Sequence, residues 1–340
     1  MALFRMLICG SGRAGLEVGR LASADGRGEV VGLFDTDPGQ LKQALQEFPN
    51  AAAGRDYPAL LAKVRPDVVV VAGPDHLHAD QTIAALQHGC HVMLEKPLAT
   101  TVADARRILE AETKAGRHVM ADHTMRYVYP WRETALAARS GKVGRIFFVQ
   151  GDYIHDMWDF YSPQGIYYTP WRADSKNPQN ILLGGGCHAI DLMLWAIDSP
   201  VTEVFAYSNK LSIPEFPADD SYIVILRFEN GAMGKVFVTS GCSGHGGPQG
   251  TFLDVYGTDG TIANGQFLRR NQEAKKLDDT SSGNVTAGHG WGGSVKDFLD
   301  LLEGKIPNPI PARAAARTVA VCDAALEAIR TGHPQKPSPI

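Results

Sequence analysis

The stretch Leu7-Ile8-Cys9-Gly10-Ser11-Gly12-Arg13-Ala14-Gly15 decides the expected fold of this chain. The apolar run from Phe4 to Ile8 predicts a buried parallel strand, and apolar residues at helical spacing follow the last glycine. Strand, glycine turn and helix in this order are typical of dinucleotide-binding folds, in which the glycines allow a tight turn, backbone contact with a pyrophosphate and close helix packing. A purely structural turn is the alternative interpretation. The expected cofactor contacts are Gly10, Ser11, Gly12, Arg13, Ala14 and Gly15.

Asp35 ends the next apolar run, Glu29 to Phe34, and follows Gly15 by twenty residues. An acid at this distance accepts hydrogen bonds from the adenosine ribose hydroxyls and repels a 2′-phosphate. Asp37 adds negative charge, whereas Arg13, which could meet a 2′-phosphate, lies in the pyrophosphate turn. The sequence therefore predicts NAD as the cofactor in preference to NADP.

Length and composition predict a two-domain globular protein in the cytoplasm. A chain of 340 residues is long for one core, and a net charge of −4 gives no electrostatic reason to expect nucleic acid or a membrane as partner. The five cysteines are scattered, which indicates reduced thiols rather than disulfides or a zinc site. No apolar run reaches membrane-spanning length, and the first strand starts too close to Met1 for a signal peptide.

Residues 1–125 alternate expected strands and helices, which predicts an α/β domain with a doubly wound parallel sheet. Further strands are expected at Asp67–Ala72, His91–Leu94 and His118–Asp122, and helices from Pro38, up to Gln87, and from Thr101 to Lys114.

Residues 126–340 carry successive hairpin signals, among them Asn230-Gly231 and Thr258-Asp259-Gly260, and so predict an α+β domain with a mostly antiparallel sheet. Expected strands are Ile146–Tyr153, Val201–Tyr207, Ser221–Phe228, Met233–Thr239, Thr251–Tyr256 and Thr261–Phe267. Expected helices are Trp131–Ser140, His188–Ile197, Trp291–Leu302 and Ala312–Arg330, and expected loops are Gly241–Gly250 and Asp278–Gly293.

Two loops of the first domain follow strands at the sheet edge where such folds bind ligands. Lys96 in the second loop could stabilise an alkoxide as hydride leaves, although a surface lysine at a helix start is the alternative. His76 and His78 point to opposite sides if extended, and no cysteine pair accompanies them, so no metal site is expected. The expected cofactor contacts in these loops are Pro74, Asp75, His78, Glu95, Lys96 and Pro97.

A glycine run, Gly184-Gly185-Gly186, precedes His188 in the second domain. A histidine titrates near neutrality and suits proton exchange with a hydroxyl or carbonyl, and Asp191 would share its helix face. A buried structural histidine is the alternative.

Polar and aromatic residues dominate the segment before this run. Their composition suits a polyhydroxylated ligand or, equally, an oligomer interface, with Trp171-Arg172 favoured for the site. The group comprises His155, Asp156, Trp158, Tyr161, Tyr167, Tyr168, Trp171, Arg172 and Asp174. The expected substrate contacts are Arg126, His155, Trp171, Arg172, Asp174 and His188.

Taken together, the glycine turn, Glu95-Lys96-Pro97 and Gly186-Cys187-His188-Ala189-Ile190-Asp191 resemble the Gfo/Idh/MocA oxidoreductase family in order and spacing over nearly the whole chain. The resemblance implies an N-terminal Rossmann domain and a C-terminal domain whose large open sheet forms homodimer or homotetramer contacts. It also implies that Lys96 polarises the reacting oxygen and that His188 is the general acid or base. The implied activity is NAD-dependent oxidation of a secondary hydroxyl, or reduction of a ketone, on a sugar, inositol or sugar derivative.

One position departs from the family pattern, because many members carry an aspartate where this chain has Gly184. Three interpretations stay open: catalysis by Lys96 and His188 alone, replacement by an acid such as Asp174 or Asp156, or a catalytically inactive regulatory protein that binds a dinucleotide. A cofactor that stays bound could also support disproportionation or glycosidic-bond cleavage. The dehydrogenase interpretation comes first because Lys96 and His188 are both present.

Overall fold

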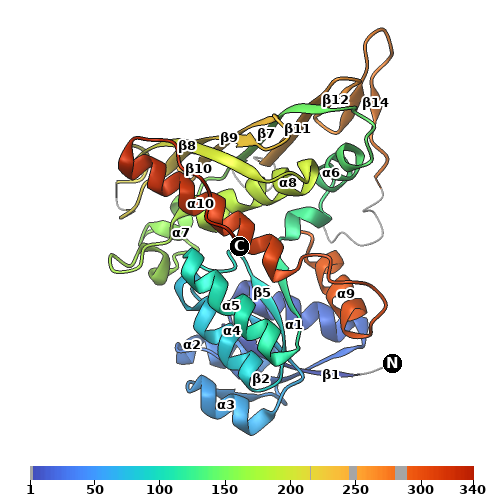
Figure 1. Cartoon of the computed structure of the whole chain (residues 1–340). Helices are drawn as coiled ribbons and strands as arrows, with labels where there is room; N and C mark the ends of the chain where they lie inside the picture. Colours follow the sequence, from blue (N-terminus) through green and yellow to red (C-terminus); the bar gives the residue numbers. More distant parts are fainter. Residues whose placement is uncertain (1–2, 215, 245–250, 280–288) are drawn as a thin grey trace. The chain divides into compact units, whose positions relative to one another are not determined.

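The computed structural model of this chain describes residues 3–214, 216–244, 251–279 and 289–340. The chain divides into two compact units, Met1–Thr124 with Gly290–Ala316 and Met125–His289 with Arg317–Ile340 (Figure 1). Two domains were expected from the sequence, divided at residue 125. The units differ from this division in one segment, because Gly290–Ala316 belongs to the first unit instead of the second.

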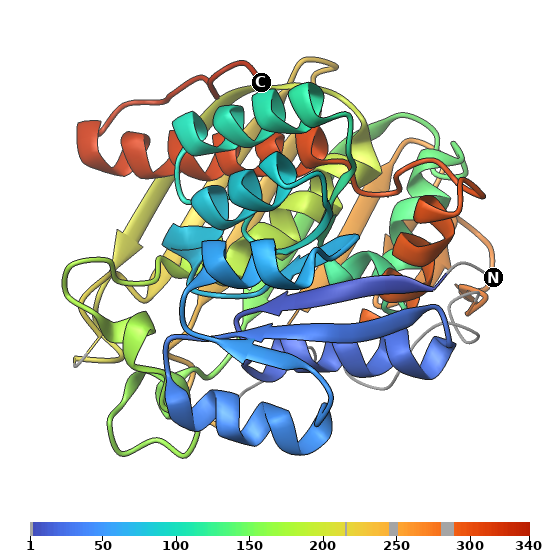
Figure 2. The same cartoon turned by 90° about the horizontal axis from the view of Figure 1, so that it is seen from below.

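The first unit contains a six-stranded parallel sheet with the order β3-β2-β1-β4-β5-β6. Its strands are β1 (Phe4–Cys9), β2 (Gly28–Phe34), β3 (Ala52–Gly54), β4 (Val68–Val71), β5 (His91–Glu95) and β6 (Val119–Asp122). All four valines of β4 are buried because helices cover both faces of this sheet (Figure 2). The strand order reverses between β1 and β4, and a crevice at the carboxyl ends of the strands there is where such sheets bind ligands.

Side chains cap three of the six helices described in the first unit. These helices are α1 (Arg13–Asp25), α2 (Pro38–Glu47), α3 (Tyr57–Val64), α4 (His78–Gln87), α5 (Val102–Ala115) and α9 (Trp291–Leu302), with the 3₁₀ turns η1 (Asp75–Leu77) and η2 (Thr124–Tyr127), the latter running on into the second unit. The Asp37 side chain caps α2 and Thr101 caps α5, as predicted. Sequence analysis missed β3, which is too short for a periodic pattern, and α3, although Asp56 caps it in the same way.

The segment Gly290–Ala316 completes the first unit. Helix α9 packs on α1 and contacts β6, Pro311 forms a bridge with Met120, and the Asn308 amide donates a hydrogen bond to the Val119 carbonyl. This segment therefore covers β6, which would otherwise be an open edge of the sheet.

The second unit contains an eight-stranded sheet with the order β14-β13-β12-β11-β7-β10-β9-β8. Its strands are β7 (Ile146–Ile154), β8 (Val201–Asn209), β9 (Ser221–Phe228), β10 (Met233–Thr239), β11 (Thr251–Gly257), β12 (Thr261–Ala263), β13 (Gln266–Leu268) and β14 (Lys275–Lys276). All neighbours are antiparallel except β7 and β10, which run parallel. The predicted α+β class with a mostly antiparallel sheet is confirmed.

Strand β7 lies between β10 and β11, so these two consecutive strands are not a hairpin. One detail of this sheet differs from the predictions. The single strand expected over Thr261–Phe267 is two short strands, β12 and β13, because Asn264 and Gly265 both adopt positive φ and turn the chain. Of the two expected loops, residues 245–250 and 280–288 lie outside the described residues, and Trp291–Gly293 already belong to α9.

Helices cover one face of this sheet and leave the other face open. The helices are α6 (Trp131–Arg139), α7 (Trp158–Tyr161), α8 (Cys187–Ile197) and α10 (Ala312–Thr331), which starts in the first unit, with the 3₁₀ turn η3 (Pro170–Ala173) and the π-helical turn η4 (Leu182–Gly186). Helices α6 and α8 pack on the central strands, and along β9 buried residues alternate with exposed Ile223 and Ile225. Among the helices of the described residues, none is long and apolar enough to cross a membrane.

Candidate functional site

The glycine turn between β1 and α1 is tightly packed on both sides of an open centre. A Cβ atom on Gly10, whose φ is +98°, would lie 2.6 Å from the carbonyl carbon of Ala72, and one on Gly15 would lie 2.3 Å from the Gly10 oxygen. At Gly12, no described atom beyond its chain neighbours lies within 4 Å of that position. Gly12 is also the N-cap of α1, and Ala14 lies in the first turn of that helix. The turn therefore fits a phosphate against open backbone at a helix N-terminus.

Asp35 lies at the same corner of the sheet as the glycine turn. Its Oδ2 accepts a hydrogen bond from the Ser11 backbone N–H at 3.0 Å, and its Oδ1 accepts one from the Asp37 N–H at 3.0 Å. A carboxylate oxygen can accept more than one hydrogen bond, so both can still receive a ribose hydroxyl. Arg13 is exposed, and its guanidinium lies over the Trp291 ring, 5.8 Å from the centroid.

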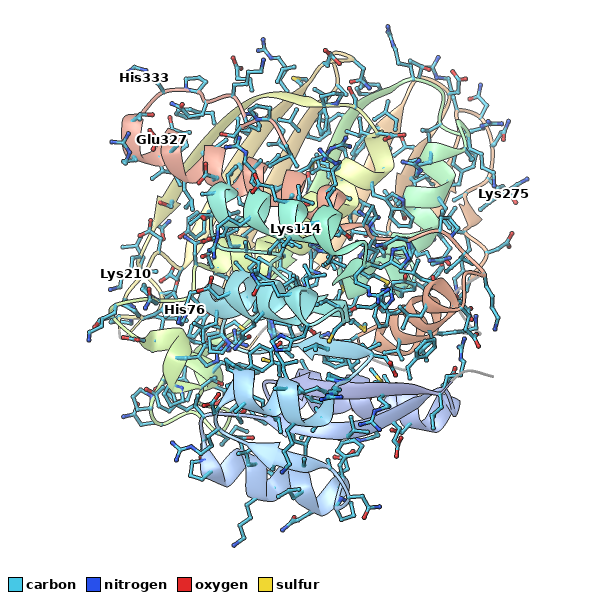
Figure 3. All side chains as sticks on the ribbon, turned by 60° about the horizontal axis from the view of Figure 1, so that its bottom comes forward. His76, Lys114, Lys210, Lys275, Glu327 and His333 are labelled. Carbon is cyan, nitrogen blue, oxygen red and sulfur yellow. The ribbon has the colours of Figure 1, made fainter. Side chains whose placement is uncertain are left out.

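His78 links the loops that follow β4 and β5. Its Nδ1 lies 2.7 Å from the Pro97 carbonyl oxygen, and its Nε2 lies 3.1 Å from the Gly73 carbonyl oxygen. Pro74 and the buried Asp75 belong to the same loop, whereas His76 is exposed (Figure 3). His78 therefore has a visible structural role, and its direct contact with a cofactor stays a prediction. Within the described ranges, no group of three or more His, Cys, Asp or Glu residues could hold a metal ion.

Lys96 follows β5 beside two carboxylates. Glu95 accepts hydrogen bonds from the Lys96 backbone N–H and from the Trp291 indole N–H, each at 3.2 Å. Asp122 is the register partner of Glu95 across β5 and β6, is buried, and accepts a hydrogen bond from the Ser294 hydroxyl. Burial raises the pKa of Asp122 well above its usual range and Glu95 raises it further, whereas the Ser294 hydrogen bond and the Lys96 charge lower it.

Three residues of this arrangement were not expected from the sequence. Asp122 could have been found, because it ends a predicted strand at the same sheet edge as Glu95. Trp291 and Ser294 carry no local signal, since they come from α9, far along the chain.

In the second unit, the glycine run before His188 is required by packing. A Cβ atom on Gly184 would lie 2.6 Å from the Gln179 amide nitrogen, and one on Gly185 would lie 2.4 Å from Cε1 of Tyr153. A Cβ atom on Gly186 would lie 2.6 Å from Cγ2 of Val238. An aspartate side chain therefore does not fit at position 184 while Gln179 occupies its place.

The two acids considered as replacements stabilise turns elsewhere. The Asp156 carboxylate accepts hydrogen bonds from the Trp158 N–H at 3.1 Å and from the Gly244 N–H at 2.8 Å. Asp174 is exposed and accepts one from the Lys176 N–H at 3.0 Å. The described contacts therefore favour neither Asp156 nor Asp174 as a substitute for the aspartate.

His188 lies in a cluster of polar and aromatic side chains. Its buried ring stacks on Tyr153 with centroids 6.0 Å apart, and the Tyr153 hydroxyl lies 3.1 Å from Nδ1 of His155. The His155 ring in turn meets Phe160 edge-on at 6.2 Å.

Arg172 extends this cluster. Its guanidinium lies 4.6 Å from the Trp171 centroid and 6.0 Å from the Phe160 centroid, and its Nη1 donates to Oε1 of Gln179. The Tyr161 hydroxyl donates to the same oxygen at 3.3 Å. We call the whole set the polar–aromatic cluster, which comprises Tyr153, His155, Phe160, Tyr161, Trp171, Arg172, Gln179 and His188.

Four of the six expected substrate contacts thus belong to the polar–aromatic cluster, whereas Asp174 and Arg126 do not. Arg126 is buried and binds the Asp191 carboxylate through Nε and Nη2, both at 2.7 Å. Its guanidinium also lies 5.0 Å from the Trp195 centroid. This ion pair gives Arg126 a structural role, and its contact with substrate stays a prediction.

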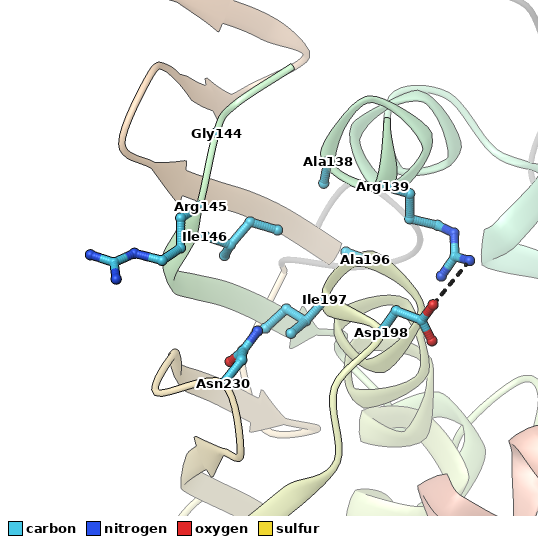
Figure 4. Close-up of a pocket in the computed structure, with 9 residues that line it drawn as sticks. All are labelled: Ala138, Arg139, Gly144, Arg145, Ile146, Ala196, Ile197, Asp198 and Asn230. Carbon is cyan, nitrogen blue, oxygen red and sulfur yellow. Dashed lines mark ion pairs between the residues drawn. The ribbon is translucent and has the colours of Figure 1, made fainter. Parts of the chain in front are cut away.

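A cavity of about 260 Å³ lies elsewhere in the second unit, at the carboxyl ends of α6 and α8 (Figure 4). Ala138, Asn230 and the exposed ion pair between Arg139 and Asp198 line it, together with neighbouring residues. None of the predicted site residues borders this cavity.

Comparison with protein-family models matches most of the chain. Residues 4–123 match an oxidoreductase family with an NAD-binding Rossmann fold, and residues 131–263 match the GFO/IDH/MocA C-terminal domain. The chain belongs to the Gfo/Idh/MocA family of oxidoreductases. NAD is the cofactor of this fold, and the open backbone at Gly12 and the Asp35 carboxylate fit its diphosphate and ribose.

Several curated relatives of this family member are named as dehydrogenases. An inositol 2-dehydrogenase from Saccharopolyspora erythraea is 28% identical over 69% of this chain and 66% of its own length. A D-glucoside 3-dehydrogenase from Escherichia coli is 33% identical over 60% of this chain and 61% of its own length. The matched region thus spans less than two thirds of these relatives.

Solved structures confirm the fold over the whole chain. The WlbA dehydrogenase from Bordetella pertussis, solved with NADH and UDP-GlcNAcA, is 25% identical with a TM-score of 0.82, and the match covers 99% of both chains. An oxidoreductase from Agrobacterium radiobacter, solved with NAD+, L-tartaric acid and magnesium, is 20% identical with a TM-score of 0.84 over 98% of both chains.

Proposed function

We propose that this chain is an NAD-dependent dehydrogenase or reductase acting on a secondary hydroxyl, or the corresponding ketone, of a sugar, inositol or sugar derivative. The observation that carries the proposal is one sheet edge of the first unit, where the open turn at Gly12, the Asp35 carboxylate and Lys96 follow strand ends. NAD, when bound, supplies the hydride acceptor or donor. The inositol and glucoside dehydrogenases among the relatives support the substrate class.

Lys96 is proposed to polarise the reacting oxygen. An ammonium beside that oxygen stabilises the negative charge that develops as hydride leaves. Glu95 supports this role, because its side chain accepts a hydrogen bond from the Lys96 backbone N–H and so helps to fix the position of Lys96.

His188 is proposed as the general acid or base. A histidine is suited to exchanging a proton with a hydroxyl near neutral pH, and the stacked Tyr153 ring limits the orientations of this imidazole. Because Gln179 fills the space beside Gly184, the chemistry is proposed to run on Lys96 and His188 without an aspartate at that position.

The experiment is a nicotinamide absorbance assay across monosaccharides, inositols, anhydrosugars and glycosides, with NAD and NADP in parallel. We expect reduction of NAD by one substrate class. We expect Lys96→Ala to lower kcat about 100- to 1,000-fold, the typical loss of a group that stabilises transition-state charge, while NAD still binds. Lys114→Ala, which removes an exposed lysine at the end of α5, is the matched control and should keep wild-type turnover.

Two outcomes would contradict the proposal. Turnover that survives in Lys96→Ala would remove the assigned role of this lysine. No change in nicotinamide absorbance with any compound of the panel, with NAD binding confirmed by calorimetry, would favour a trapped-cofactor enzyme or an inactive regulatory protein. Extraction of bound nucleotide, and a test of whether it exchanges with added NAD, would separate these two alternatives.

The proposal includes a homodimer or homotetramer in the cytoplasm. The open face of the eight-stranded sheet supports self-association, because large apolar side chains on it are exposed, such as Ile225 at 45% and Met233 at 52%. The scattered cysteines support a reducing compartment. Light scattering of the purified protein would measure the assembly directly.

A further inference from the structure

Among the described residues, no acid balances the positive charge of Arg172. Among the residues that the structure describes, no carboxylate lies within ion-pair distance of its guanidinium, and the enclosed Nε has no hydrogen-bond partner there. The buried arginines Arg126 and Arg27, in contrast, form ion pairs: Arg126 binds Asp191, and Arg27 binds three carboxylates. A cation in a partly enclosed place is costly without a counter-charge, so Arg172 is the unusual case.

The contacts of Arg172 fix its position without neutralising it. Gln179 supplies a neutral amide oxygen to Nη1, and the Gln179 backbone N–H donates to the Arg172 carbonyl oxygen at 2.9 Å. The rings of Trp171 and Phe160 hold the flat guanidinium by cation–π contact. Asp174, the acid nearest in sequence, is exposed and bonded to its own turn. A held, uncompensated guanidinium is the form of arginine that binds carboxylates and phosphates.

The glycine at position 184 is part of the same arrangement. Gln179 occupies the space that a side chain at 184 would need, since a Cβ atom there would lie 2.6 Å from its amide nitrogen. An aspartate at 184 would both displace this amide and bring a negative charge toward Arg172. The Gln179–Gly184 pair therefore keeps the positive charge available.

Arg172 and His188 also belong to one continuous set of contacts. From His188 the contacts pass through Tyr153, His155 and Phe160 to Arg172. In addition, Gln179 bonds to Arg172 and packs against the η4 turn that leads to His188. Through Gln179 and Gly184, Arg172 is therefore linked to the turn that carries His188.

We propose that the substrate is anionic: a sugar or polyol that carries a carboxylate, such as a uronate or aldonate, which pairs with Arg172. This inference rests on the proposed function, because it names the substrate class of that same site. Arg172 is a specificity-determining residue in this view, and Gln179 is the positioning residue that leaves its charge unpaired.

The test compares molecules that differ mainly in charge. Glucuronate and galacturonate are assayed with NAD against glucuronamide, glucose and galactose, and methyl glucuronide is included for a larger anomeric group. Binding of each compound is measured separately by calorimetry in the presence of NADH. We expect the carboxylates to be preferred over their neutral counterparts by at least about tenfold in kcat/KM and in affinity, as for a charge-assisted hydrogen bond.

Two variants act on the charge in different ways. Arg172→Met removes it, and Gln179→Glu neutralises it by adding a carboxylate to the existing contact. Both should lower kcat/KM for the carboxylates about 10- to 100-fold more than for the neutral compounds. Arg269→Met is the matched control, because Arg269 is an exposed arginine stacked on Phe267 at 5.0 Å, and it should behave as wild type.

The outcomes separate the inference from the proposed function. Turnover without a preference for charge, or equal losses for charged and neutral compounds in Arg172→Met, overturns the inference and leaves the dehydrogenase standing. Charge-dependent binding without turnover supports the inference and contradicts the dehydrogenase. No binding or turnover of the carboxylates, with turnover of a neutral compound, overturns the inference alone, and no binding or turnover of any compound contradicts both.

Discussion

The two glycine-rich runs of this chain have opposite surroundings. In the first unit, the central glycine of the Gly10–Gly15 turn faces open space, with no described atom beyond its chain neighbours within 4 Å of a Cβ position. In the second unit, all three glycines from Gly184 to Gly186 face other side chains at 2.4 to 2.6 Å. One run makes room for a ligand, whereas the other makes room for the protein itself.

This difference shows how the dinucleotide-binding corner of the first unit and the polar–aromatic cluster of the second unit are built. Backbone groups and one carboxylate form the dinucleotide-binding corner, so little side-chain packing is needed there. The polar–aromatic cluster depends on contacts between side chains. Gly184 has no side chain and thereby leaves the space that the Gln179 amide occupies. A substitution at Gly12 should therefore change ligand binding, whereas one at Gly184 should change stability.

The largest expected effect tests how far the second unit depends on buried polar contacts. Arg126→Ala should lower the free energy of unfolding by about 3–5 kcal/mol, because it leaves the buried Asp191 carboxylate without its cation. The control Arg139→Ala breaks an exposed pair with Asp198 and should cost no more than about 1 kcal/mol. Urea denaturation followed by circular dichroism measures both. An Arg126→Ala protein of wild-type stability that has lost turnover would instead support the predicted substrate contact of Arg126.

The next effect compares the two glycine runs directly. Gly184→Ala should cost about 1–3 kcal/mol of unfolding free energy, because its methyl group overlaps the Gln179 amide. Gly12→Ala should cost less, at most about 1 kcal/mol, because alanine is a poorer N-cap than glycine but Gly12 has a φ of −83° and open space around it, and it should weaken NAD binding. Adding Gln179→Ala to Gly184→Ala should restore part of the loss. Equal losses of unfolding free energy in the two single variants would contradict the difference in packing between Gly12 and Gly184.

The smallest effect concerns the selectivity of the dinucleotide-binding corner. Asp35→Ser should narrow the preference for NAD over NADP about tenfold, because it removes the acid that favours a ribose hydroxyl over a 2′-phosphate. Dissociation constants for both cofactors, measured by calorimetry, check this. Asp37→Ser, which changes the neighbouring acid that caps α2, is the comparison variant and should narrow the preference less than Asp35→Ser does. If Asp35→Ser keeps the wild-type ratio, other groups discriminate between the cofactors.

The sequence predicted the first unit better than the second for a physical reason. A parallel sheet buried on both faces produces continuous apolar runs, such as Val68–Val71. The starts of some helices between the strands are marked in the sequence by capping residues such as Asp37. The antiparallel sheet depends on pairings between distant segments. No local pattern shows that β7 enters between β10 and β11, or that Gly290–Ala316 returns to the first unit.

The same division applies to the candidate site. The glycine turn and Asp35 could be predicted because their spacing follows from one strand–turn–helix unit and the strand after it. Gln179 could not, because its importance arises from contact with Gly184 and Arg172 after folding. Ser294 and Trp291 were missed for the same reason, since they reach Asp122 and Glu95 from the far end of the chain.

The position of Gly290–Ala316 in the first unit has a consequence for the folding of this protein during its synthesis on the ribosome. Residues 1–124 emerge first, but β6 and part of α1 stay uncovered until α9 has been synthesised. During that interval the nascent chain exposes apolar surface and an unpaired strand edge, the features that attract chaperones or lead to aggregation. A gene fragment that ends before residue 290 would hold the cofactor-binding corner permanently in that unfinished state.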